Sequence, residues 1–195
     1  MSGTHTDALI SRQVRRLETL LEDRGIVVGA ALDEMLDAFL GGATPLNGAR
    51  VAARAWTDPA YKERLLADGT AAVTELGYSA GGVQPQRLRV VENTDDTHNV
   101  VVCTLCSCYP VRLLGPSPSW YKSEAYRARV GREPRAVLEE FGLRLPAATR
   151  ITVWDSSAET RYLVLPRRPE GTDALTEEEL AARVTRNGLI GTAAL

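Results

Sequence analysis

All three cysteines of the chain lie within six residues, as Cys103, Cys106 and Cys108 in the pattern C-x-x-C-x-C. Thiolates are soft metal ligands, and this spacing lets the intervening backbone supply ligands as well. A metal ion over Cys106-Ser107-Cys108 closes chelate rings through both sulfurs and through the amide nitrogens of Ser107 and Cys108. Cys103 then adds an axial sulfur, and a sixth position stays open for water or substrate. Because only a strongly Lewis-acidic ion displaces amide protons, the pattern predicts a trivalent metal.

Two other interpretations of the same spacing are a zinc site and a disulfide. A C-x-x-C pair is often half of a zinc site or a redox pair. Zinc prefers four side-chain ligands in a tetrahedron, and the two histidines of the chain are His5 and His98. Since His98 lies five residues before Cys103, a site of three cysteines and one histidine stays open at this point.

The flanking sequence carries further motifs, at residues 92–94, 98–110, 120–123, 126–127, 132–135, 153–159, 161–162 and 164–169. Together they resemble the nitrile hydratase alpha subunit family, from about residue 8 to the C terminus. Thr104, between the first two cysteines, resembles the cobalt class, because the iron class has Ser there. The gamma subunit of thiocyanate hydrolase shares the same cysteine motif, so the metal site alone does not select the substrate.

The resemblance implies one non-corrin cobalt(III) ion, favoured over iron(III), held by Cys103, Cys106, Ser107 and Cys108. It also implies that Cys106 is oxidised to a sulfinate and Cys108 to a sulfenate, while Cys103 stays a thiolate. In the family, two arginines of a beta subunit partner these oxygens, and no motif here assigns an internal arginine to them. We therefore expect the chain to need a beta subunit for full activity, with an activator or metallochaperone as a further partner.

The implied reaction is the hydration of a small-molecule nitrile to the corresponding amide. A trivalent metal polarises a bound nitrile or acidifies a bound water. The nitrile carbon is then attacked by hydroxide or by the sulfenate oxygen of Cys108, and we favour the sulfenate because it is already held near the substrate. Ser107 orients water through its hydroxyl. Cys108 and Ser107 are thus the expected catalytic residues.

Four residues are expected in the substrate pocket: Gln84, Tyr109, Val111 and Trp120. Gln84 aligns with a substrate-side glutamine of the family, and an ordinary polar residue at a strand edge is the alternative. Tyr109 is expected at the pocket mouth, with an aromatic packed beside a turn as the alternative. Val111 stands where the family usually has Trp, and Arg112 follows it, so we expect a wider and more polar pocket that suits a bulky, heterocyclic nitrile. A position facing the partner subunit is the alternative for both residues.

Asp155, Glu159 and Arg161 match a network that lies behind the metal-binding loop in the family. A surface turn with an ordinary ion pair is the alternative. Groups behind a metal site orient its ligands and typically alter activity ten- to a hundredfold. We therefore expect this network to influence turnover.

Composition restricts the class of protein. The chain has 195 residues and a formal net charge of −2, which argues against a nucleic-acid or membrane-surface partner. We find no apolar run of the roughly 18 residues that span a bilayer and no export signal at the N terminus. Cysteines crowded into one loop form no disulfide framework. The expected location is the cytoplasm.

Hydrophobic periodicity predicts helices at residues 8–23, 31–40, 47–56 and 58–77 in the first part of the chain. The second part predicts strands near 88–90, 99–102, 149–154 and 161–165, with a hairpin or tight loop at 155–160. Further helices are expected at 123–130, at 134–141 and from a capping box at Thr176 to about 185, whereas 110–118 is expected to be a non-helical bend.

This order of elements indicates an α+β fold. The expected chain is a single nitrile hydratase alpha-type domain, with a helical arm at about residues 1–55 and a globular catalytic part at about 56–195. The resemblance implies that the globular part is layered α-β-β-α and carries the metal-binding loop. It also implies that the arm wraps the partner subunit.

Overall fold

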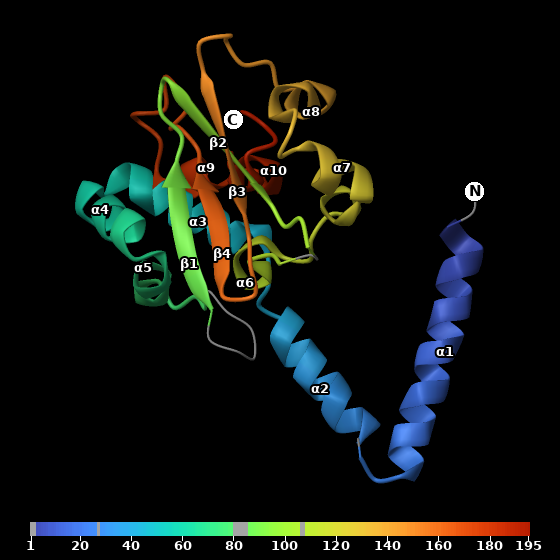
Figure 1. Ribbon diagram of the computed structural model, residues 1–195. Coiled ribbons are helices and arrows are strands. Elements are labelled where there is room, and N and C mark those ends of the chain that lie inside the picture. The colour runs from blue at the N-terminus through green and yellow to red at the C-terminus, as the bar shows by residue number, and fades with distance from the viewer. Residues whose placement is uncertain (1–2, 27, 80–85, 106–107) are drawn as a thin grey trace. The chain divides into compact units, whose positions relative to one another are not determined.

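The computed structural model describes residues 3–26, 28–79, 86–105 and 108–195. Its contacts divide the chain into two units, Met1–Gly42 and Ala43–Leu195. The first unit consists of α1 (Gly3–Asp23) and α2 (Gly29–Leu40), drawn in blue in Figure 1. Both predicted helices are confirmed. Most large apolar side chains of α1 are exposed, namely Leu9, Ile10, Val14, Leu17 and Leu20.

The second unit begins with α3 (Pro45–Thr57), α4 (Pro59–Ala67) and α5 (Gly69–Glu75). The prediction of one helix over 58–77 is wrong, because the chain breaks at Asp68. The backbone of Asp68 is extended, its N–H caps α4 at the Arg64 carbonyl over 2.8 Å, and its carboxylate accepts from the Ala71 N–H at 3.1 Å. Asp is a preferred N-cap residue, so one side chain ends a helix and begins the next.

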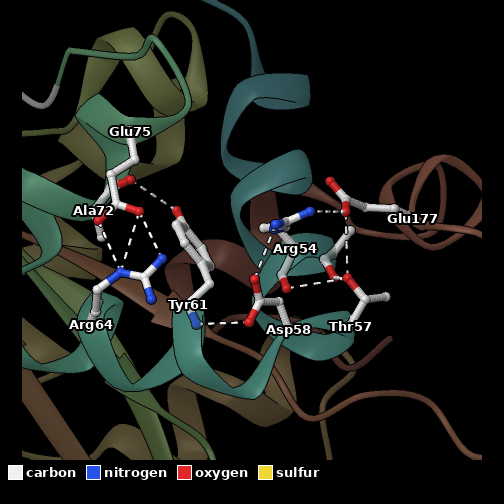
Figure 2. Close-up of polar contacts among 9 residues, drawn as sticks. Arg54, Thr57, Asp58, Tyr61, Arg64, Ala72, Glu75 and Glu177 are labelled. Atoms are coloured by element: carbon white, nitrogen blue, oxygen red, sulfur yellow. Dashed lines mark hydrogen bonds and ion pairs between the residues drawn. The ribbon is translucent and has the colours of Figure 1, made fainter.

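Figure 2 shows the polar contacts that join these helices to one another and to α9 (Glu177–Ala181). Arg54 pairs with Asp58 at 3.0 Å and with Glu177 of α9 at 3.5 Å. Arg64 pairs with Glu75 of α5 at 2.8 Å. The N–H of Tyr61 donates to Asp58, and this bond is the main reason that the pKa of the Asp58 carboxyl is lowered. These contacts fix the helical side of the unit.

Among the described residues, four strands form two parallel pairs. β1 (Arg87–Glu92) pairs with β4 (Thr160–Leu165), and β2 (Thr97–Val102) pairs with β3 (Arg150–Asp155). The hairpin alternative for residues 155–160 is therefore wrong, since β3 and β4 belong to different sheets and a tight loop connects them. Parallel partners need long crossover connections, and here helices lie between the paired strands in the sequence.

The sheets lie between helices, with α4 and α5 on one flank of the strands and α7 (Glu124–Arg129) and α8 (Pro134–Glu140) on the other (Figure 1). Strand β2 is almost wholly buried, as expected where helices and sheets cover both faces. The layered α+β architecture is confirmed. No helix in the described ranges is long and apolar enough to cross a membrane.

Short helical segments occur in the described part of the chain where none was predicted. Residues 110–118 contain one helical turn, α6 (Val111–Leu114), which begins after Pro110 and ends at Gly115 with φ +67°. The expectation of a wholly non-helical bend is wrong because the proline and the glycine bound a helical turn here. The predicted capping box at Thr176 and Glu179 is confirmed, but α9 ends at Ala181 and α10 (Arg186–Ile190) follows as a separate helix.

Candidate metal centre

Strand β2 leads directly into the cysteine loop. Its last residues, Val100 to Val102, are buried, and Cys103 follows with 1% of its surface exposed. Cys108, at the other end of the loop, is half-buried, and no disulfide joins it to Cys103. Cys106 and Ser107 lie outside the described residues. The two described thiols therefore lie at the two ends of one short loop, anchored by a rigid strand on one side.

Asp155 ends β3 beside Val102 in the strand register, which places its carboxylate next to the loop. Its two oxygens accept from the N–H and the hydroxyl of Thr104, at 2.9 and 2.5 Å. The next residue, Ser156, donates its N–H to the Val102 carbonyl at 2.7 Å. Arg127 of α7 donates to the Thr104 carbonyl at 3.4 Å. The first half of the loop is thus held by contacts with a carboxylate, a guanidinium and backbone.

Two buried tyrosines of an aromatic cluster, in η1 (Ser119–Lys122) and α7, contact the loop and strand β2 respectively. The hydroxyl of Tyr121 donates to the Cys108 carbonyl at 3.0 Å, and that of Tyr126 donates to the Val101 carbonyl at 2.7 Å. Burial raises the pKa of both phenols, so both stay protonated donors. Sequence reasoning assigned no role to either tyrosine; the available signal was that a buried tyrosine hydroxyl needs a partner.

Of the expected pocket residues that the structure describes, Tyr109 is the most buried, with 8% of its surface exposed. Its ring contacts Tyr121 edge-on, with the centroids 5.1 Å apart. Burial raises the pKa of Tyr109, and its buried hydroxyl has no hydrogen-bond partner among the described residues. The aromatic packed beside a turn, the alternative stated above, matches this placement more closely than a side chain at a pocket mouth.

Trp120 is half-buried and contacts Tyr126 and Phe141 edge-on, with centroid distances of 4.9 and 4.7 Å. Val111 is half-buried at the first position of α6. Gln84 lies outside the described residues. The roles of these three residues in a substrate pocket stay predictions.

Glu159 and Arg161 meet through Ser157 rather than through a direct ion pair. The Ser157 hydroxyl donates to Glu159 at 2.8 Å, and this bond is the main cause of a lowered pKa for the Glu159 carboxyl. Arg161 is 8% exposed and donates to the Ser157 carbonyl. The structure therefore brings Asp155 into contact with the cysteine loop, and Ser157 joins Glu159 of the β3–β4 connection to Arg161 at the start of β4.

His98 is not available as a zinc ligand. Its Nε2 lies 2.7 Å from the Gly191 carbonyl, which only accepts, so Nε2 carries the proton and Nδ1 accepts from the Asn93 amide at 3.3 Å. Both ring nitrogens are used. Five residues of extended strand, roughly 16 Å, separate His98 from Cys103. The zinc site that includes His98 is therefore ruled out.

The donor set fits a thiolate-bound metal ion. Cys103 is buried next to a hydrogen-bonded carboxylate, and Cys108 lies where Tyr121 holds its carbonyl. A site that excludes water on one side and keeps its ligands in fixed positions is a preorganised one. Cys103 and Cys108 are the described residues that would hold the ion.

Comparisons with known proteins show which family this chain resembles. The family model described as nitrile hydratase, alpha chain, matches residues 8–193. The cobalt-containing nitrile hydratase subunit alpha of Pseudonocardia thermophila is 52% identical over 183 residues, which are 93% of this chain and 89% of that protein. The thiocyanate hydrolase subunit gamma of Thiobacillus thioparus is 49% identical over 158 residues, which are 76% of this chain and 65% of that protein.

Solved structures agree in fold. A double mutant of the Fe-type nitrile hydratase from Comamonas testosteroni Ni1 superimposes with a TM-score of 0.90 at 42% identity, over 96% of this chain and 91% of that chain. A recombinant thiocyanate hydrolase with partially modified cobalt centers also superimposes, with a TM-score of 0.89 at 41% identity over 94% of this chain and 88% of that chain. Relatives with either metal thus share the architecture. The fold by itself does not choose between cobalt and iron.

Proposed function

Because the chain belongs to the nitrile hydratase alpha-chain family, we propose that it is the metal-carrying alpha subunit of a heteromeric nitrile hydratase. The reaction adds water to a nitrile and gives the corresponding amide. The observation that supports this most directly is the cysteine loop, where Asp155 holds Thr104 near one end and Tyr121 holds the carbonyl of Cys108 at the other. Such preorganisation is what a catalytic metal centre requires.

The proposed ion is cobalt(III), with iron(III) as the alternative. Cys103, Cys106 and Cys108 would hold it through sulfur, and Ser107 and Cys108 through their amide nitrogens. When bound, it would supply the Lewis acidity that polarises a nitrile. Thr104 and the cobalt-containing relative support cobalt, and the Fe-type structural neighbour keeps iron as the alternative.

The chain's own groups have distinct proposed roles. Cys108, as a sulfenate, would add its oxygen to the nitrile carbon while one C–N π bond breaks and the nitrogen takes up a proton; water would then release the amide and restore the sulfenate. Direct attack by water on the nitrile carbon is the alternative. Ser107 orients water through its hydroxyl. Asp155, through Thr104, keeps the first half of the loop in place, while Glu159 and Arg161 keep the β3–β4 connection in place behind it. Cys106 is proposed to be a sulfinate, so that Cys106 and Cys108 are the two oxidised ligands of the ion.

The proposed partner is a nitrile hydratase beta subunit, which would supply arginines to the oxidised cysteines. The exposed apolar side chains of α1 support a role for this helix as an arm that packs against the partner and buries those side chains there. An activator or metallochaperone is proposed to load the metal. The proposed location is the reducing cytoplasm, since the three cysteines form no disulfide framework.

The proposed substrate is a bulky, polar nitrile such as a heterocyclic one. Val111, in place of a family tryptophan, supports a wider pocket, and Arg112 supports a more polar one. The Arg112 carbonyl accepts from the Asn47 amide at 2.9 Å, which ties α6 to α3 and gives this pocket wall a fixed backbone.

The test is to co-produce the chain with its beta subunit in cobalt-containing medium and to measure metal content, amide formation and the mass of the cysteine-loop peptide. We expect cobalt, turnover of nitriles, and added oxygen on Cys106 and Cys108. Zinc with three unmodified thiols would contradict the proposal. Faster turnover of thiocyanate than of nitriles would instead favour the second candidate function, a thiocyanate hydrolase gamma-type subunit, which the match to that protein supports.

A further inference from the structure

Tyr121 connects the aromatic cluster to the last cysteine of the loop. Its side chain is 0% exposed, and its hydroxyl donates to the Cys108 carbonyl at 3.0 Å. This contact is to a backbone atom, so it does not depend on the state of the thiol. It therefore acts on the backbone of a proposed metal ligand rather than on the sulfur.

Neighbouring rings fix the position of the Tyr121 hydroxyl. The Tyr109 ring contacts it edge-on at 5.1 Å, and the rings of Trp120 and Tyr126 lie 6.0 Å away, centroid to centroid. The backbone N–H of Tyr121 donates to the Pro118 carbonyl at 3.1 Å. A donor held in this way restrains its acceptor, because the ring has no room to follow a shifted carbonyl.

We propose that Tyr121 is a positioning residue that sets the orientation of Cys108 in the metal centre. The carbonyl, the amide nitrogen and the side chain of Cys108 share one Cα, so holding the carbonyl restricts how the nitrogen and sulfur face the ion. Catalytic groups must be held within about 0.5 Å of their productive geometry. This inference rests on the proposed function and adds a residue to it.

Tyr126 provides a matched control. It is also a buried tyrosine of the same cluster, and its hydroxyl donates to a backbone carbonyl at 2.7 Å. Its acceptor, however, belongs to Val101, a residue of β2 that β3 already holds in register. Tyr126→Phe thus removes an equivalent hydrogen bond without touching the loop.

The experiment compares Tyr121→Phe and Tyr126→Phe in the chain co-produced with its beta subunit and cobalt. For Tyr121→Phe we expect a shifted visible absorption band of the metal centre, incomplete oxidation of Cys108 and a kcat lowered roughly ten- to a hundredfold, with KM little changed. For Tyr126→Phe we expect the parental spectrum and kcat, with only a lower Tm. Identical spectra and kcat values for both variants and the parent would overturn the inference.

Two further outcomes are informative. If Tyr121→Phe does not assemble, 3-fluorotyrosine at position 121 keeps the ring and alters only the donor strength; the band should then shift, and an unchanged band overturns the inference. If the parent protein itself binds no cobalt and hydrates no nitrile, the proposed function fails and this inference fails with it. A spectral difference confined to the Tyr121 variants supports both the proposed function and the role of Tyr121 in positioning Cys108.

Discussion

Asp155 holds Thr104 through both carboxylate oxygens, one accepting from the backbone N–H at 2.9 Å and the other from the hydroxyl at 2.5 Å. The pair joins the end of β3 to the cysteine loop that follows β2. Charge-assisted hydrogen bonds of this kind are stronger than those between neutral groups. Thr104, from which the sequence predicts the cobalt class, is therefore also a structural anchor of the loop.

Asp155→Ala should lower kcat roughly ten- to a hundredfold while leaving Tm almost unchanged, because Asp155 lies at an exposed strand end. Thr104→Val should lower kcat less, since the backbone N–H still donates to Asp155. Steady-state kinetics on the two single variants and the double variant will show whether the effects overlap, as expected for groups in contact. Asp95→Ala is the control, because this aspartate lies at the opposite end of β2 and pairs with Arg167. Normal turnover in Asp155→Ala would contradict the positioning role.

Stability should fall as the pH is lowered through the ordinary histidine range because of His98. Burial lowers the pKa of His98, although the Gly191 carbonyl partly opposes the shift. The unfolded chain therefore binds a proton below about pH 6.5 that the folded chain resists, so the free energy of unfolding decreases there. The Tm of the assembled protein should fall more between about pH 7.5 and about pH 5.5 in the parent than in His98→Gln. Equal slopes of Tm against pH in the two proteins would show that His98 does not contribute to the pH dependence of stability.

Gly191→Ala should prevent stable folding. Gly191 has φ +89°, and a Cβ there would overlap the Asn99 carbonyl oxygen and come within 2.9 Å of the Val100 Cα. Gly77→Ala separates backbone strain from steric overlap. Gly77 also has a positive φ, +78°, but no heavy atom lies within 4 Å of a Cβ built there. Backbone strain alone costs about 1–2 kcal/mol, so Gly77→Ala should fold with a modestly lower Tm, whereas Gly191→Ala should lose soluble yield. Similar losses in both variants would argue against the steric cause.

Val111→Trp should narrow the proposed substrate pocket. The ratio of kcat/KM for a heterocyclic nitrile to that for a small aliphatic nitrile should fall about tenfold or more, as expected when a pocket wall excludes the larger substrate. Val111→Ile, which changes the volume little, is the control and should leave the ratio nearly unchanged. An unchanged ratio in Val111→Trp, with normal metal content, would indicate that this position faces the partner subunit.

Local signals predicted most of the helices. Thr176 and Glu179 form the capping box that their spacing indicates, and Gly25 ends α1 with a positive φ. The wrong helix predictions lie where a single residue ends or begins a helix. Asp68 breaks the helix predicted over 58–77, and Pro110 precedes the helical turn α6. Such caps are short, and hydrophobic periodicity averages over them.

The sequence by itself predicted a metal-binding loop, because three thiols in C-x-x-C-x-C are a local pattern whose spacing allows backbone ligands. The tertiary structure alone decided which strands pair, that His98 lies away from Cys103, and that Tyr121 and Asp155 reach the loop from 13 and 51 residues away. Alternation along a strand tells which face is buried but not which strand lies beside it. Contacts made by chain segments distant in sequence depend on how whole layers pack, and no local spacing encodes them.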